Sequence, residues 1–310
     1  MEAEMKTKIA VLYYHRVYVK QNDTNLLCVE PKKFEQQMKY LKKNYNILRF
    51  EEDWSKSDRD GIVITFDDGY LDNLTYALPI LDELQIPATV FVSTGILSGS
   101  RELWWDELET VLLTDGNYPK RFSLEDEVYS CEWRTDTYEY RLNCYKGLHY
   151  LMKNYISPSK REIWFEQLWK WRGLVRYVNV ENNTLTDTTC LELAKSKYIT
   201  IGAHTISHPS LAKLTYEEQQ AEIMSSVVYL ENLLQRKIDI LSYPFGVEGV
   251  DFDENTIIAC KKAGIRKAAS TKAELWQKQS DEYKIPRNGT KNCGLFEFKA
   301  KMVEIFDSKE

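Results

Sequence analysis

Strand-like and helix-like segments alternate at both ends of this chain, and this alternation restricts its fold more than any other feature. Short apolar runs at 8–14, 61–66 and 88–92 are interspersed with amphipathic segments such as 34–45, and the alternation returns at 198–243. Parallel strands joined by helical crossovers produce this order of elements. The sequence therefore predicts an α/β fold.

Residues 101–195 interrupt the alternation. The segment is polar, lacks a clear strand pattern and carries six of the eight tryptophans, which are Trp104, Trp105, Trp133, Trp164, Trp169 and Trp171. We expect a mainly helical, aromatic-rich insertion between a first part at 1–100 and a second part at 196–310. Clustered aromatic side chains could form the core of a small subdomain or a platform on which sugar rings stack. Trp104, Trp105 and Asp106, near the start of the insertion, are the residues expected closest to a cleft.

The composition excludes several classes of protein. The 310 residues carry a formal net charge of −6, so the chain lacks the basic footprint that binding to nucleic acid requires. Its apolar runs are strand-sized, and a membrane-spanning helix needs about 20 apolar residues. The first six residues mix acidic and basic side chains, so no secretory leader can be drawn. We expect a cytoplasmic protein with no transmembrane segment.

Two of the four histidines occur together. His204 and His208 are four positions apart and directly follow the predicted strand at 198–203. Two neutral imidazoles, joined by a carboxylate from elsewhere, would make a mixed nitrogen and oxygen site of the kind that suits Zn²⁺. The alternative is an ordinary pair of histidines in a surface loop.

Two adjacent carboxylates end another predicted strand. Asp67 and Asp68 directly follow the apolar run at 61–66 and precede Gly69. Adjacent carboxylates repel one another unless a cation compensates them, so the pair indicates a metal site or a solvated turn. Ligand sites in α/β proteins gather where parallel strands end. The combination of this acidic pair with the histidine pair therefore favours a metal centre.

Five motifs resemble one known family. They are Thr65-Phe66-Asp67-Asp68-Gly69, His204-Thr205-Ile206-Ser207-His208-Pro209, the stretch from Ile86 to Val92, Tyr243-Pro244-Phe245-Gly246, and the N-terminal Tyr13-Tyr14-His15-Arg16-Val17. Together they are similar to the polysaccharide deacetylases of the NodB-homology superfamily, carbohydrate esterase family four, in the branch whose third motif is YPFG. The resemblance implies a distorted (β/α)7 barrel with a divalent metal where the strands end. It also implies hydrolysis of N-acetyl groups on amino sugars.

The resemblance also implies roles for individual residues. Asp68, His204 and His208 would bind the metal, most simply Zn²⁺, although Co²⁺, Ni²⁺ or Fe²⁺ would suit the same ligands. Asp67 matches the base of the family. Tyr243, Phe245 and Trp105 are candidates for contact with the substrate or its oxyanion, with a backbone N–H near Phe245 as the donor.

The chain departs from the usual pattern of the family at two positions. No histidine follows His208, so the usual late acid is missing and His15 is the candidate in its place, whereas His149 in the insertion is expected to be incidental. Ser242 stands where the third motif usually begins with arginine. Arg287 could supply that positive charge beside Asp67, or it could form an ordinary surface salt bridge.

The leading hypothesis is thus a metal-dependent hydrolase that removes acetyl groups from an N-acetylated carbohydrate, either a glycan or a glycan precursor. A deformylase or another amide hydrolase on the same frame is the nearest alternative. A catalytically silent glycan-binding protein is a third reading, because part of the family pattern is absent.

Overall fold

The computed structural model describes residues 7–307, and these residues form two compact units. The first unit comprises residues 7–97 and 184–307, and the second comprises residues 98–183. The chain therefore leaves the first unit once, builds the second, and returns.

The first unit is built on one parallel sheet. In spatial order its strands are β11 (Lys267–Ala269), β10 (Ile240–Ser242), β9 (Ile199–Ala203), β6 (Ala88–Val92), β5 (Gly61–Phe66), β1 (Ile9–Tyr14) and β12 (Asn288–Gly289), and β4 (Asn46–Leu48) also pairs with β5. Ile285 bridges Ala269 of β11, while Asn288 pairs with Leu12 of β1, so one short segment contacts both edges of the sheet. The sheet is curled as in a barrel, which confirms the expected α/β class.

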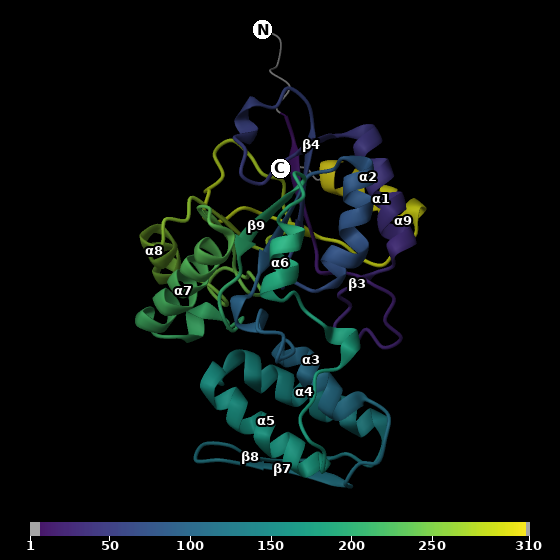
Figure 1. Ribbon diagram of the computed structural model, residues 1–310, viewed down its shortest axis with the longest axis vertical. Helices are drawn as coiled ribbons and strands as arrows, with labels where there is room; N and C mark the ends of the chain where they lie inside the picture. The colour runs from purple at the N-terminus through teal and green to yellow at the C-terminus, as the bar shows by residue number, and fades with distance from the viewer. Residues whose placement is uncertain (1–6, 308–310) are drawn as a thin grey trace. The chain divides into compact units, whose positions relative to one another are not determined.

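Helices follow most of these strands, and their ends carry recognisable sequence signals. They are α1 (Pro31–Asn44), α2 (Leu78–Leu84), α6 (Asp187–Leu193), α7 (Tyr216–Leu234), α8 (Glu254–Lys262) and α9 (Leu295–Asp307). Helix α1 begins at a proline, and Thr215 forms a reciprocal capping box with Glu218 at the start of α7. Helices α7 and α8 pack together, and α1 packs against α2 and α9 (Figure 1).

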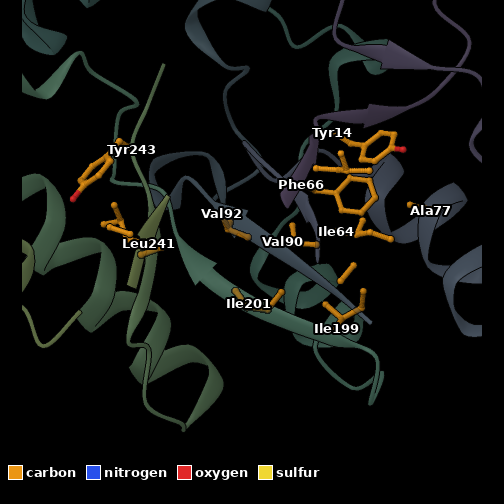
Figure 2. Close-up of a cluster of buried hydrophobic side chains, with 14 of the residues drawn as sticks. Tyr14, Ile64, Phe66, Ala77, Val90, Val92, Ile199, Ile201, Leu241 and Tyr243 are labelled. Atoms are coloured by element: carbon orange, nitrogen blue, oxygen red, sulfur yellow. The ribbon is translucent and has the colours of Figure 1, made fainter. Parts of the chain in front are cut away.

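The curled sheet has a different core on each face, because successive side chains of a strand point to opposite sides. The inner face holds Ile9, Val11, Phe50, Trp54, Val63, Phe91, Ile240, Ala269, Trp276 and Ile285. The outer face packs against the helices and forms the larger cluster. Figure 2 shows part of it, from Tyr14 and Phe66 through Val90 and Ile201 to Leu241.

The strand register brings the predicted site segments to one edge of the sheet. Tyr14 pairs with Phe66, so His15 and Asp67 leave neighbouring strands together. Val92 likewise pairs with Ala203, the residue before His204. The segments that begin at His15, Asp67 and His204 therefore all lie at the carboxyl edge of the same sheet.

The second unit contains three helices and a hairpin. The helices are α3 (Trp104–Leu113), α4 (Tyr138–Asn154) and α5 (Pro158–Arg172), and the hairpin pairs β7 (Arg121–Glu125) with β8 (Ser130–Arg134). The sequence, in which this segment lacks a clear strand pattern, did not indicate the hairpin. In β7 only Phe122 and Leu124 are buried, so the alternation is short and its exposed positions are polar or charged.

The second unit ends before the boundary expected at residue 195. Residues 184–195 belong to the first unit, where the Leu185 amide donates to the Gly69 carbonyl at 2.8 Å. Leu185, Cys190 and Leu193 also lie in the outer core of the sheet. Polar residues on the outer side of α6 conceal this packing in the sequence.

Between residues 7 and 307, no helix has the length and apolarity needed to cross a lipid bilayer. A cytoplasmic location stays a prediction.

Candidate metal centre and active site

Three residues from two strand ends converge on one point. Asp68 follows β5, and His204 and His208 follow β9. The Nε2 atoms of His204 and His208 lie 3.4 and 3.3 Å from Oδ1 of Asp68, and all three side chains are buried. Potential ligand atoms of the trio lie within 4.8 Å of one another. The structure thus brings together the three residues that the sequence assigned to a metal.

The donor chemistry of this trio fits a divalent cation. His204 Nδ1 lies 2.7 Å from the Ser242 carbonyl oxygen, so Nδ1 carries a proton and a neutral ring points the lone pair of Nε2 at Asp68. A lone pair facing a buried carboxylate oxygen is repulsive unless a proton or cation lies between them. Oδ1 of Asp68 also lacks a hydrogen-bond donor among the described residues. Two imidazoles and one carboxylate are a common ligand set for Zn²⁺ and related ions.

The charges of the trio shift its pKa values in opposite directions. Burial raises the pKa of Asp68, but the adjacent imidazoles of His204 and His208 outweigh it and hold this pKa far below its ordinary value. Burial lowers the pKa of His204, but the facing carboxylates of Asp68 and Asp67 raise it overall. The lowered pKa keeps Asp68 ionised between the two imidazoles, and a buried carboxylate in this position favours binding of a cation.

Asp67 is held by a forked ion pair. Nη1 and Nη2 of Arg287 donate to Oδ1 and Oδ2 of Asp67 at 2.8 and 2.7 Å, and Arg287 is 0% exposed. Burial raises the pKa of Asp67, but the charge of Arg287 outweighs it and lowers this pKa overall. Of the two readings for Arg287, the contact with Asp67 is therefore present and a surface salt bridge is not.

The rest of the Arg287 guanidinium is also satisfied. It donates to Thr65 Oγ1 at 3.2 Å, to Ser242 Oγ at 2.8 Å and to the Ser270 carbonyl at 2.9 Å. Its carbon atom lies 4.9 and 5.8 Å from the ring centroids of Tyr13 and Phe91. Arg287 thus lies on the inner face of the sheet next to Asp67, and these contacts fix its orientation.

His15 lies in the same unit, in the single position between β1 and β2 (Arg16–Val17). Its ring is 5.7 Å from the ring of Tyr13. Burial raises the pKa of Asp67, Arg287 lowers it, and the charge of His15 lowers it further. Burial also raises the pKa of Asp68, His204 and His208 lower it, and the charge of His15 again adds to the lowering. His149 instead lies in the second unit, with its ring 4.8 Å from that of Trp104.

Left-handed backbone is concentrated at the candidate site. Among the described residues, seven that are not glycine have positive φ, and four of them are Asp68, Thr205, His208 and Phe245. Such conformations cost about 1 kcal/mol or more each and persist where surrounding contacts impose them. Gly69 continues this turn with a φ of 87°, which glycine adopts freely. Backbone strain therefore marks the loops that carry the converging side chains.

Glu222 organises the histidine loop, and the sequence did not indicate this. Its carboxylate accepts hydrogen bonds from the backbone amides of Ile206 and Ser207 at 2.9 and 3.0 Å, and from the Ser207 hydroxyl at 2.6 Å. The loop between His204 and His208 is thereby tied to α7. In the sequence, Glu222 is one of several glutamates on an amphipathic helix, and nothing local distinguishes it.

The three expected substrate contacts differ in position. Phe245 packs its ring 4.8 Å from that of His208, so its loop borders the trio. Tyr243 points the other way: its ring stacks on Phe252 at 4.0 Å, and its hydroxyl donates to the Tyr283 carbonyl. Trp105 is buried in the second unit. Contact of Trp105 with substrate, and donation by a backbone N–H near Phe245, stay predictions.

Comparison with known sequences identifies one family. A sequence profile described as polysaccharide deacetylase matches residues 55–114 and 176–268, which include Asp67, Asp68, His204 and His208. The chain is also 23% identical over 294 residues to YxkH of Bacillus subtilis (strain 168), provisionally named a polysaccharide deacetylase, covering 93% of this chain and 73% of that protein.

Solved structures share the fold. Streptococcus pyogenes deacetylase PplD, in complex with acetate, superposes with a TM-score of 0.61 at 17% identity, covering 96% of this chain and 98% of that one. BC0361, a polysaccharide deacetylase from Bacillus cereus, gives a TM-score of 0.60 at 21% identity over 96% and 69% of the chains. IcaB from Ammonifex degensii gives 0.60 at 15% identity over 96% of each. The curled parallel sheet is therefore of the NodB type.

Proposed function

Since the chain belongs to the polysaccharide deacetylase family, we propose that it removes the acetyl group from an N-acetylated amino sugar with the help of a divalent metal. Members of this family hydrolyse amide bonds of acetylated sugars. The substrate would be a glycan or a glycan precursor. The observation that carries the proposal is the meeting of two arrangements at one sheet edge. One is the trio of Asp68, His204 and His208, and the other is Asp67 forked by Arg287.

Asp68, His204 and His208 would hold the cation. When bound, a divalent cation polarises the acyl carbonyl and lowers the pKa of a water molecule. The hydrogen bond from His204 to the Ser242 carbonyl fixes the ring so that Nε2 faces the site. Outer contacts of this kind orient ligands and support metal affinity.

Asp67 would act as the base. Its lowered pKa keeps it ionised near neutral pH, and the fork from Arg287 fixes both of its oxygens. It would accept a proton from the water that attacks the acyl carbon. A positioned base contributes on the order of 10²- to 10⁴-fold to such a step.

His15 would act as the acid. Breaking the bond between the acyl carbon and nitrogen requires a proton for the departing amine, and His15 leaves its strand at the same level as Asp67. Transfer of that proton to the nitrogen leaves acetate and a free amino sugar. Of the four histidines, His204 and His208 are taken by the trio and His149 lies in the other unit, which supports His15.

Acetate release tests the proposal directly. The purified protein is incubated with a panel of N-acetylated amino-sugar oligomers, with Zn²⁺ or Co²⁺ and with EDTA. We expect release that EDTA abolishes and that Asp67→Asn and Asp68→Asn each lower by about 10²-fold or more. Asp58→Asn, at an exposed position of the same unit, is the matched control and should release acetate normally. EDTA-insensitive release would contradict the metal assignment.

The same panel separates the alternatives. Preference for N-formyl over N-acetyl sugars would identify a deformylase on this frame. A silent glycan-binding protein predicts binding of sugar oligomers without release of any acid, and binding that Asp67→Asn leaves intact. The fully buried and oriented pair of Asp67 and Arg287 favours hydrolysis over that reading, because a binding surface does not require it.

A further inference from the structure

Asp72 and Asn73, which follow the Thr65–Gly69 motif, bind the loop that carries His15. Asn73 Nδ2 donates to the carbonyl oxygen of His15 at 2.8 Å. Asp72 accepts from Nε of Arg16 and from the backbone amide of Val17, both at 2.9 Å. Three successive residues of the β1–β2 connection are therefore held by one pair of side chains, which we name the Asp72–Asn73 clamp.

The clamp is buried and charged. Asp72 and Asn73 are 4% and 1% exposed, and Arg16 is 2% exposed. The guanidinium of Arg16 also lies 4.4 Å from the centroid of the Tyr70 ring, so the cation is enclosed between a carboxylate and an aromatic face. Buried charge-assisted hydrogen bonds are directional and costly to break. The backbone on the C-terminal side of His15 is consequently fixed.

The other side of His15 is fixed by the sheet. Tyr14, the last residue of β1, is anchored by its backbone pairing with Phe66 of β5, while its hydroxyl donates to Gln37 of α1 at 2.9 Å on the outer face of the sheet. Strand alternation then directs His15 to the inner face, on the same side as Tyr13 and Asp67. His15 is thus a single residue between two anchored segments. Without the clamp, the C-terminal side of His15 would be held only by the two-residue pairing of β2 with β3 (Cys28–Val29).

We propose that Asp72 and Asn73 are positioning residues that hold His15 in place to protonate the departing amine. The inference rests on the proposed function of His15 as the acid and extends it to two residues that do not touch the substrate. A displacement of about 1 Å in a proton donor can cost on the order of 10²-fold in rate. The clamp controls this displacement through the backbone of His15.

Three variants test the clamp. Asn73→Asp keeps the shape but turns a carboxylate oxygen toward the His15 carbonyl, and Asn73→Ala removes the bond with less strain. Asp72→Asn removes the charge that faces Arg16. Tyr14→Phe is the matched control, because it deletes a buried hydrogen bond of the residue next to His15 on the opposite face of the sheet.

The first measurement does not depend on activity. The chain has four histidines, so ring-labelled histidine gives a small set of NMR signals that His15→Gln assigns for this residue. We expect shifted or multiple His15 signals in the clamp variants, with the His149 signals unchanged. Tyr14→Phe should leave the His15 signals as in the parent. Unchanged His15 signals in both folded Asn73 variants would overturn the proposal.

The second measurement separates positioning from general damage. An activated ester such as para-nitrophenyl acetate releases a leaving group that needs no proton, whereas an amide nitrogen does. The clamp variants, like His15→Gln, should lose roughly tenfold or more of amide turnover while ester turnover stays within about twofold. Tyr14→Phe should keep the parent ratio of the two. Equal loss on both substrates would assign the clamp a purely structural role.

The two measurements also distinguish the failure of each hypothesis. If the parent hydrolyses no amide, the proposed function fails, and the NMR signals still decide whether the clamp fixes His15. If His15→Gln hydrolyses the amide normally, His15 is not the acid and the clamp is not a catalytic positioning device, while deacetylation itself stands.

Discussion

Arg287 and Asp67, which are 220 positions apart in the chain, form a fully buried fork in which each guanidinium Nη donates to a different carboxylate oxygen. A guanidinium matches a carboxylate in this two-point geometry, and an ammonium group does not. Arg287 in turn is fixed by Thr65, Ser242 and Ser270. The orientation of the proposed base thus depends on residues from four strand ends.

Replacement of Arg287 by lysine should reduce deacetylation without preventing folding. Arg287→Lys retains a positive charge but loses the fork, so Asp67 becomes free to rotate and its pKa rises toward its ordinary value. We expect kcat/KM to fall by about 10²-fold and the acid limb of its pH profile to move to higher pH. Arg266→Lys is the matched control, because Arg266 pairs with Asp239 on the exposed surface of the same unit. An unchanged acid limb in Arg287→Lys would refute the role assigned to the fork.

Glu222→Gln should weaken the binding of a cation. The side chain keeps its size but loses one acceptor, so the amides of Ile206 and Ser207 are held less firmly and His208 is less well placed. Substitutions of this kind lower metal affinity by about 10- to 100-fold. Competition titration of Zn²⁺ measures the effect. Glu217→Gln, at an exposed position of the same helix, should bind Zn²⁺ as the parent does, and equal affinities in all three proteins would contradict the prediction.

Cation binding should stabilise the first unit. A ligand that binds only the folded state adds about 2.7 kcal/mol at a concentration one hundred times its dissociation constant. We expect Zn²⁺ to raise the melting temperature of the EDTA-treated protein. Asp68→Asn lacks the carboxylate of the trio and should show little or no rise. A rise of the same size in Asp68→Asn would place the cation elsewhere.

Glu102 should make the stability of the second unit depend on pH. Burial raises its pKa from 4.5 to about 7, although it accepts hydrogen bonds from Asn179, Asn182 and Thr110. Between these two values the folded state keeps a proton that the unfolded state has lost. Stability should therefore fall as pH rises from about 4.5 to about 7, by at most roughly 3 kcal/mol, and then level off.

Tryptophan fluorescence can follow this unfolding, because six of the eight tryptophans lie between residues 101 and 195. Glu102→Gln, which resembles the protonated form, should flatten the decline, whereas Glu125→Gln at an exposed position of the same unit should not. A stability that rises over this pH range in the parent protein would show that the carboxyl is ionised in the folded state.

Local signals in the sequence predicted most individual elements well. Thr215 and Asp253 cap the first turns of α7 and α8, and such signals can be read from the sequence because a cap depends on residues within one turn. The hairpin of β7 and β8 was missed, since its alternation spans few residues and is mixed with charges. The return to the first unit at residue 184 was also missed, because packing of α6 on the sheet leaves no distinct local pattern.

The sequence by itself indicated the proposed ligand trio and the neighbouring proposed base, because Asp67 with Asp68, and His204 with His208, are short motifs placed directly after apolar strands. Only the tertiary structure decided what supports them. The curling of the sheet places Arg287 beneath Asp67, and packing of α7 brings Glu222 to the histidine loop. These partners are far apart in the chain, and the register and closure of the sheet, which local periodicity does not encode, determine which of them meet.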